Sequence, residues 1–168
     1  GAHVISALGD IAGFAHFEFD QSPKTGMWTN PLWNTTNDVD YAGQKPLTVI
    51  RVGREQGAIS HDGGITWKPF AGKPTSMRST GSAAISANGK TIVQQPNGGT
   101  ASWSDDEGAT WHATTGEVTS GRVVADRINP LKFFIYDGKA GKLYRSNLRS
   151  IFYSSFDLKF QKIGRAHV

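Results

Sequence analysis

The stretch SHDGGITW, residues 60–67, recurs 44 residues later as SDDEGATW, residues 104–111. Both copies follow the pattern Ser-x-Asp-x-Gly-x-Thr-Trp. The shared positions are Ser60, Asp62, Gly64, Thr66 and Trp67 in the first copy and Ser104, Asp106, Gly108, Thr110 and Trp111 in the second. An internal repeat at a fixed period indicates that one structural unit is used several times along the chain.

The segments before each copy are short, rich in β-branched residues and bounded by turn residues, and such segments predict β-strands. They are residues 47–52 and 58–60 before the first copy, and residues 90–95 and 101–104 before the second. Residues 132–136 and 142–146 have the same character and lead into a third, degraded copy, in which Leu148 and Ser150 replace the Asp and Gly. Short strands with a super-period of about 40–45 residues predict four-stranded blades of an all-β propeller, of which the chain holds three to four.

The composition of the 168 residues fits a β-rich domain and excludes several classes of protein. Gly accounts for 20 residues and aromatic residues for 11% of the chain, whereas a disordered segment is poor in aromatic residues. The apolar runs are far shorter than the ~20 residues that cross a bilayer. The net charge of +4 comes from scattered Lys and Arg, which argues against nucleic-acid binding. The chain has no Cys, and its five His are widely spaced, which argues against a disulfide or a zinc site.

The repeated pattern is an Asp-box, and the physics of a β-turn explains its residues. An Asp side chain accepts backbone N–H groups across the turn, Gly supplies a positive φ, and the Trp packs between neighbouring sheets. Asp62 and Asp106 have the chemistry of catalytic carboxylates, but a reaction site does not recur once per blade. We therefore assign the Asp-box residues to a structural role, and we predict that residues 126–130 form a turn between blades.

A different kind of carboxylate lies near the start of the chain. The sequence SALGDIAGFAH, residues 6–16, places Asp10 among small and apolar residues and follows it with His16. A ligand can approach such a backbone closely, and a poorly solvated carboxyl has the raised pKa that a general acid requires. Asp10 is therefore a candidate catalytic residue, with a turn-capping role as the alternative.

Two tryptophans flank a Pro in residues 27–33. Trp28 and Trp33 are five positions apart, which is a poor spacing for one face of a strand. On a loop, a Trp offers a flat apolar face to a sugar ring. We expect these rings to bind sugar, and the alternative is that one of the two belongs to the core.

With these motifs together, the chain resembles the C-terminal propeller of glycoside hydrolase family 74, the xyloglucan-degrading endo- and exo-glucanases. The resemblance runs through most of residues 1–145. Besides the two Asp-boxes it includes residues 1–16, 29–33, 39–42, 50–53 and 126–130. Asp-boxes are shared with sialidases and sortilin-like receptors, whereas the Gly-Asp-Ile-x-Gly-Phe-x-His segment, residues 9–16, is much more specific.

The resemblance implies a fragment of a seven-bladed propeller that faces an N-terminal propeller of the same chain across a substrate cleft. It implies inverting hydrolysis with one catalytic Asp from each propeller. Asp10 is assigned as the general acid, and the alternative is that the roles are reversed and Asp10 is the base that activates the water. With one carboxylate of two, the 168-residue chain alone is expected to be inactive. His16, Trp28, Trp33 and Tyr41 are the expected substrate-binding residues. The implied parent is a secreted xyloglucan-specific endo-β-1,4-glucanase that uses no metal or organic cofactor and has no nucleic-acid or membrane partner.

Two other functions remain open at this point. A non-catalytic Asp-box propeller that binds carbohydrate or protein needs no chemistry from Asp10. A sialidase needs an Arg cluster and a Tyr nucleophile, for which the sequence offers no matching context.

We divide the chain into a partial propeller, residues 1–161, and a segment of different origin, residues 162–168. The heptapeptide KIGRAHV is what the start of a common short-read sequencing adapter encodes, which predicts that it is not native to the protein. An ordinary polar C-terminus is the alternative.

Overall fold

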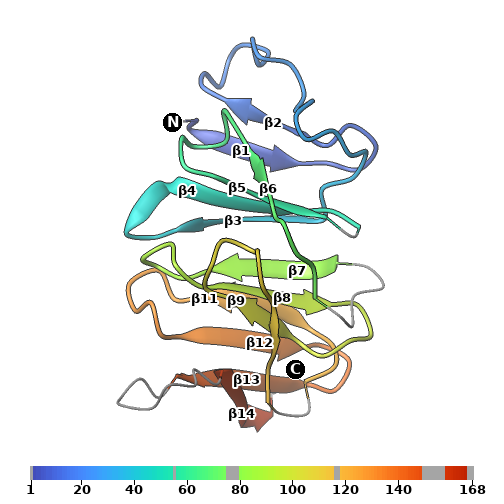
Figure 1. The fold of residues 1–168 in the computed structure, drawn as a ribbon, viewed down its shortest axis with the longest axis vertical. Helices are drawn as coiled ribbons and strands as arrows, with labels where there is room; N and C mark the ends of the chain where they lie inside the picture. Colours follow the sequence, from blue (N-terminus) through green and yellow to red (C-terminus); the bar gives the residue numbers. More distant parts are fainter. Residues whose placement is uncertain (1, 55, 75–79, 116–117, 149–157, 166–168) are drawn as a thin grey trace.

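The computed structural model describes residues 2–54, 56–74, 80–115, 118–148 and 158–165. Its strands form four antiparallel sheets that follow one another along the long axis of the molecule (Figure 1). The first sheet pairs β1 (Val4–Ala7) with β2 (Gly13–His16). Each of the other three sheets has four strands in sequence order, which is the meander of a propeller blade.

The three blades are built from consecutive strands. The first consists of β3 (Asp38–Ala42), β4 (Lys45–Val52), β5 (Gly57–Ser60) and β6 (Lys68–Pro69). The second consists of β7 (Thr80–Ile85), β8 (Ile92–Pro96), β9 (Ser102–Ser104) and β10 (His112–Ala113). The third consists of β11 (Arg122–Ala125), β12 (Phe133–Asp137), β13 (Lys142–Leu148) and β14 (Leu158–Arg165).

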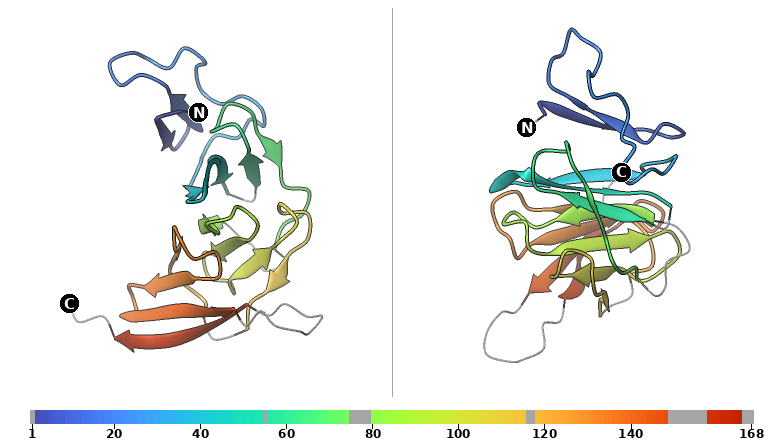
Figure 2. Two further views of the ribbon diagram at one scale, coloured as in Figure 1. Left: turned by 90° about the vertical axis from the view of Figure 1, so that its left-hand side faces the viewer. Right: turned by 45° about the horizontal axis from the view of Figure 1, so that its top comes forward.

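The expectation of an all-β partial propeller is confirmed. The strands expected from the sequence correspond to β4, β5, β8, β9, β12 and β13, with ends shifted by at most about two residues. Figure 2 shows the same succession of sheets from two further sides, with β1 and β2 at one end and β13 and β14 at the other. No helix long and apolar enough to cross a membrane occurs in the described residues.

The core lies between neighbouring sheets. One buried cluster joins Ile50 and Ile59 of the first blade to Ile85 of the second, and another joins Trp103 of the second blade to Phe133 of the third. Middle strands of the first and second blades are buried on both faces, as the patterns of β5 and β8 show. Because successive side chains of a strand point to opposite faces, these two blades pack against a neighbour on either side. In the third blade, β12 alternates between buried and more exposed positions.

The first strands of the three blades, β3, β7 and β11, lie side by side. Two carboxylates of β3 accept backbone N–H groups of β7: Asp38 Oδ2 accepts from Ala83 at 3.2 Å, and Asp40 Oδ2 accepts from Ile85 at 2.8 Å. These side chains provide hydrogen-bond partners that a continuous sheet would provide through its backbone. The blades are therefore joined by polar contacts at their inner strands as well as by apolar contacts between their faces.

Both inner-strand carboxylates also meet an Arg of the third blade. Arg122 Nη2 lies 3.1 Å from Asp38 Oδ1, and Arg127 Nη2 lies 2.6 Å from Asp40 Oδ1. Burial raises the pKa of Asp38 and Asp40, because desolvation outweighs the attraction of these guanidinium groups. Arg127 belongs to residues 126–130, which form a turn after β11, and Asp126 caps that turn by accepting two backbone N–H groups.

The C-terminal segment is described only in part. The backbone of residues 162–165 belongs to β14, which pairs with β13 from Leu148↔Leu158 to Lys142↔Arg165. Residues 166–168 lie outside the described residues. A strand pairing does not report the origin of the peptide, so the assignment of residues 162–168 as non-native stays a prediction.

Candidate functional site

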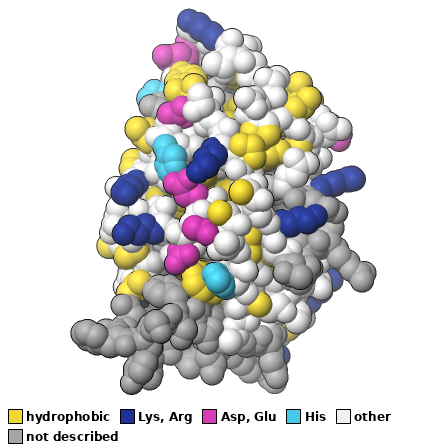
Figure 3. All heavy atoms as spheres, in the orientation of Figure 1, with side chains coloured by type: hydrophobic (Ala, Val, Ile, Leu, Met, Phe, Trp, Pro, Cys, Tyr) yellow, Lys and Arg dark blue, Asp and Glu magenta, His cyan; other side chains and the backbone are white. Residues whose placement is uncertain are grey.

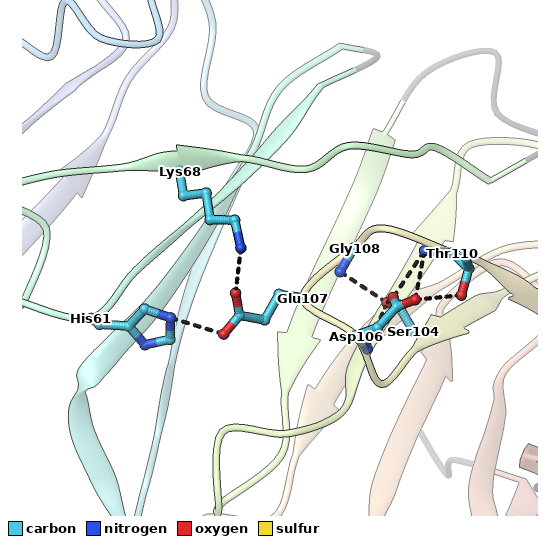
Figure 4. A network of polar contacts seen from close by, with 7 residues as sticks. All are labelled: His61, Lys68, Ser104, Asp106, Glu107, Gly108 and Thr110. Carbon is cyan, nitrogen blue, oxygen red and sulfur yellow. Dashed lines mark hydrogen bonds and ion pairs between the residues drawn. The ribbon is translucent and has the colours of Figure 1, made fainter.

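The two Asp-boxes form turns of nearly identical geometry at the ends of β5 and β9. In the second box, Asp106 accepts the backbone N–H of Thr110 at 2.8 Å and its hydroxyl at 2.6 Å, as Figure 4 shows. Ser104 Oγ donates to Asp106 at 2.8 Å and accepts the N–H of Gly108 at 2.9 Å. Both carboxylate oxygens of Asp106 are occupied by its own turn. The side chain is therefore engaged in holding the turn and is not presented to a substrate.

The first Asp-box repeats these contacts. Asp62 accepts the N–H and hydroxyl of Thr66 and the hydroxyl of Ser60. The indole N–H of Trp67 donates to Gly64 O at 3.1 Å, the distance that also separates Trp111 Nε1 from Gly108 O. Gly64 and Gly108 have φ of +86° and +80°, the left-handed region that favours glycine.

Hydrogen bonds lower the pKa of the Asp-box carboxyls. The pKa of Asp106 falls to about 2, chiefly because the hydroxyl and N–H of Thr110 stabilise the carboxylate. Desolvation acts in the opposite direction on Asp62, but the bonds from Thr66 and Ser60 outweigh it, so its pKa is also lowered. The folded protein therefore favours the ionised form of these two groups.

This shift predicts an acid-dependent loss of stability. A carboxyl with a depressed folded pKa contributes stability above its unfolded value of ~3.9, and the contribution disappears as pH falls through the folded pKa. We expect Asp106→Asn to be less stable than wild type at pH 6 and to lose less stability between pH 4 and pH 2. Urea unfolding across that pH range measures it. Asp105→Asn, which removes the neighbouring exposed charge, is the control, and an equal change in both variants would contradict the assignment.

The second Asp-box also links two blades through Glu107. Its carboxylate lies 3.1 Å from His61 Nε2 and 2.9 Å from Lys68 Nζ, both on the first blade. Figure 3 shows acidic, basic and imidazole side chains gathered near the middle of this face of the molecule. Because these groups are largely exposed, the contacts contribute little to stability, and they resemble a surface ion-pair network more than a reaction site.

Asp10 lies in the tight connection between β1 and β2. Two backbone hydrogen bonds tie this connection to the segment before β3: Ala12 N–H donates to Asn34 O at 2.9 Å, and Thr36 N–H donates to Leu8 O at 3.1 Å. Asp10 and Ala12 have φ of 65° and 58°, which is uncommon for residues other than Gly. Unusual backbone at two positions this close together is typical of functional loops.

The side chain of Asp10 is exposed and lines a pocket of about 370 Å³. The other lining residues come from two segments, the loop before β3 and the turn after β4: Leu32, Trp33, Asn34, Thr35, Arg54 and Gln56. The poorly solvated setting expected for Asp10 is therefore not present in this chain by itself. A carboxylate at the rim of an open polar pocket can exchange a proton with a bound hydroxyl or glycosidic oxygen.

The structure does not bring the five expected site residues together. Of these residues, Asp10 and Trp33 line the same pocket. His16 lies at the far end of the β1–β2 hairpin and contacts Ser6 Oγ through Nε2 at 2.9 Å. Tyr41 lines a different pocket, beside β1, and the Arg127 guanidinium lies 4.3 Å from the centre of its ring.

The expectation that Trp28 and Trp33 offer ring faces to sugar is corrected by their burial. Their side chains belong to the core, with exposed fractions of 6% and 7%. The guanidinium of Arg51 lies 4.8 Å from the ring centre of Trp28 and 4.0 Å from that of Trp33. A ring face covered by a buried cation cannot stack on a sugar. The sequence placed both residues on a loop correctly, but it did not show that this loop folds back onto β4.

The polar residues beside Asp10 were missed at the sequence level. Asn34 and Thr35 follow Trp33, and Arg54 and Gln56 follow β4 about 45 residues after Asp10 in the chain. No local motif joins these two segments, and only the packing of the first blade against β1 and β2 places them together. Among the described residues, no group of three or more His, Asp or Glu is arranged to hold a metal ion.

The curated proteins that are similar to this chain include several xyloglucanases. No family model matches the chain. It is 36% identical over 155 residues to a xyloglucanase of a Paenibacillus species, covering 87% of this chain and 15% of that protein. It is 33% identical over 164 residues to a xyloglucanase of Hypocrea jecorina, covering 94% of this chain and 18% of that protein. The chain thus spans less than a fifth of the length of these relatives.

The solved structures give the same result for the fold. The GH74 xyloglucanase of Xanthomonas campestris superposes with a TM-score of 0.84 at 32% identity, covering 98% of this chain and 23% of that one. The GH74 enzyme of Niastella koreensis superposes with a TM-score of 0.68 at 29% identity, covering 84% of this chain and 20% of that one. The resemblance to glycoside hydrolase family 74 is therefore confirmed: over nearly its whole length, this chain is homologous to one segment of the GH74 enzymes.

Proposed function

We propose that this chain is part of a GH74 xyloglucanase and that Asp10 is one of the two carboxylates that carry out the hydrolysis. The observation that carries the proposal is the position of Asp10, exposed at the rim of a polar pocket on a loop with two left-handed non-glycine residues. The names of the relatives, which are xyloglucanases, support the choice of substrate.

In the proposed reaction, the Asp10 carboxyl donates its proton to the leaving glycosidic oxygen. A carboxylate on a facing propeller removes a proton from the attacking water. Inversion at the anomeric carbon requires the two carboxyl groups to be ~6.5–9.5 Å apart, so that the water fits between base and sugar.

The pocket beside Asp10 has the groups to orient a neutral sugar. Asn34, Thr35 and Gln56 carry side chains that both donate and accept hydrogen bonds, and Arg54 donates only. Hydroxyls of a glucan chain need both kinds of partner. Leu32, whose side chain is 59% exposed, adds an apolar surface at the same pocket. We propose that the parent enzyme acts outside the cell, because xyloglucan is a large external polymer.

The purified 168-residue chain is expected not to release reducing ends from xyloglucan. It holds one carboxylate of the proposed pair, and each general acid–base component contributes ~10²–10⁴-fold to the rate. A reducing-end assay at several protein concentrations measures this. Activity that increases in proportion to the chain and disappears in Asp10→Asn would show that the second carboxylate lies within these residues.

A further inference from the structure

Arg51 is a buried cation enclosed by three tryptophans. Its side chain is fully buried, and its guanidinium carbon lies 4.8, 4.0 and 4.9 Å from the ring centres of Trp28, Trp33 and Trp67. Among the residues that the structure describes, no carboxylate pairs with it, and Nε and Nη1 have no hydrogen-bond partner. Burial lowers the pKa of Arg51 to about 10. A hydrocarbon side chain would fill this space without the cost of an unpaired buried charge, so packing alone does not explain an Arg here.

A hydrogen bond of the guanidinium leads to the loop before β3. Arg51 Nη2 donates to the backbone oxygen of Pro31 at 2.7 Å. Two residues later, Trp33 lies against the guanidinium and donates its indole N–H to Thr36 Oγ1 at 3.3 Å. Residues 31–36 are thus held to the buried second half of β4 by two contacts with Arg51, one through the Pro31 carbonyl and one through the Trp33 ring.

The same loop carries the backbone groups that hold the Asp10 connection. Asn34 O accepts the N–H of Ala12, and Thr36 N–H donates to Leu8 O. Trp28, which also contacts the cation, donates its backbone N–H to Gly13 O at 3.0 Å. Its indole ring packs so closely on Gly13 that a Cβ at that position would lie 2.5 Å from a ring carbon. The segments that bond to the two ends of this connection therefore include residues that contact Arg51: Pro31 and Trp33 on one side and Trp28 on the other.

We infer that Arg51 is a positioning residue that fixes the Asp10 loop through Pro31 and the tryptophan rings. This inference rests on the proposed function of Asp10. A planar guanidinium suits the task, because it stacks on several rings and donates in its plane to the Pro31 carbonyl at the same time. The strained loop is exposed on its outer side, so its geometry depends on the support beneath it.

In the complete enzyme, Arg51→Met is expected to lower kcat on xyloglucan by about 10- to 100-fold and to raise KM by a smaller factor. A displacement of about 1 Å at the reacting group has an effect of this size on the chemical step. The sugar-binding side chains of Asn34 and Thr35 lie on the same loop but remain present, so binding weakens less than chemistry. Arg51→Lys keeps a cation and a donor but not the planar group, so its kcat should lie between those of the wild type and Arg51→Met. Retained kcat in Arg51→Met, or an increase in KM as the main effect, would overturn the inference.

The two Asp-boxes offer a matched pair of variants. Trp67→Phe and Trp111→Phe each remove an indole N–H that donates to a Gly carbonyl at 3.1 Å, but only Trp67 touches Arg51. We expect Trp67→Phe to lower kcat several-fold and Trp111→Phe to leave it unchanged. Equal losses would mean that these residues act through general stability.

Hydrogen exchange separates this inference from the proposed function. In Arg51→Met, the amides of Ala12 and Thr36 should exchange at least about tenfold faster, whereas the Ile85 amide, held by Asp40, should not change. If Asp10→Asn hydrolyses xyloglucan normally, the proposed function fails, and the exchange rates still decide whether Arg51 holds the loop. If Asp10→Asn is inactive but the two amides stay protected in Arg51→Met, the inference alone fails.

Discussion

Asp10→Asn is expected to lower the turnover of xyloglucan by the complete enzyme by ~10²–10⁴-fold, the contribution of a single general acid. Asn has nearly the same shape as Asp but cannot donate the proton that the leaving oxygen needs. Both residues tolerate left-handed backbone, so the φ of 65° at this position should be kept. Single-turnover hydrolysis and equilibrium binding of a xyloglucan oligosaccharide, measured on the same variant, separate chemistry from affinity.

Asp20→Asn is the control for the loss of one negative charge, because Asp20 is an exposed Asp ten residues further along the chain. It should hydrolyse xyloglucan at the wild-type rate. If Asp10→Asn also keeps more than about half of the wild-type rate, Asp10 is not the general acid. Asp10 would then be a turn residue, and a binding propeller would become the better account of the chain.

Phe133→Ala is expected to destabilise the folded chain by ~3–5 kcal/mol, which is the range for removing a large buried aromatic side chain. Phe133 is fully buried in the cluster that joins the second and third blades. Its removal leaves a cavity at the contact between two sheets, where neither sheet can collapse without moving the other. Urea unfolding followed by tryptophan fluorescence measures the change, and Trp103 in the same cluster is one of the five tryptophans that contribute to the signal.

Phe19→Ala is the matched control, because the Phe19 side chain is 79% exposed. An exposed substitution of this kind should change the free energy of unfolding by less than about 0.5 kcal/mol. Similar effects for the two variants would mean that the blades do not pack as described, and would contradict the propeller.

The repeat could be predicted from the sequence because its determinants are local. Asp62 and Asp106 hold turns within eight residues of sequence, so their hydrogen bonds follow from residue type and spacing. The strands between them follow from β-branched segments bounded by turn residues. The role of Asp38 and Asp40 in joining the blades could not be predicted from a local pattern, because the β7 groups that they bind lie 45 residues away in the sequence.

The candidate site was only partly predictable, for the same reason. The segment around Asp10 stood out by its composition, but its neighbours Arg54 and Gln56 come from a turn far along the chain. Trp28 and Trp33 are buried against Arg51, a cation inside an apolar strand that a sequence pattern would place at the surface. Burial of this kind is decided by tertiary packing, which local patterns do not report.

The central claim is that Asp10 is a catalytic carboxylate of a GH74 xyloglucanase, and the most direct test is a chimera in which this chain replaces the matching segment of a known GH74 enzyme. The matching segment of the Xanthomonas campestris GH74 xyloglucanase is about a quarter of that protein, and it can be replaced by this chain, which covers 23% of it. We predict that the chimera hydrolyses xyloglucan and that Asp10→Asn in the chimera abolishes hydrolysis while the protein stays folded by circular dichroism. A folded chimera that hydrolyses xyloglucan equally well with Asp or Asn at position 10 would contradict the account.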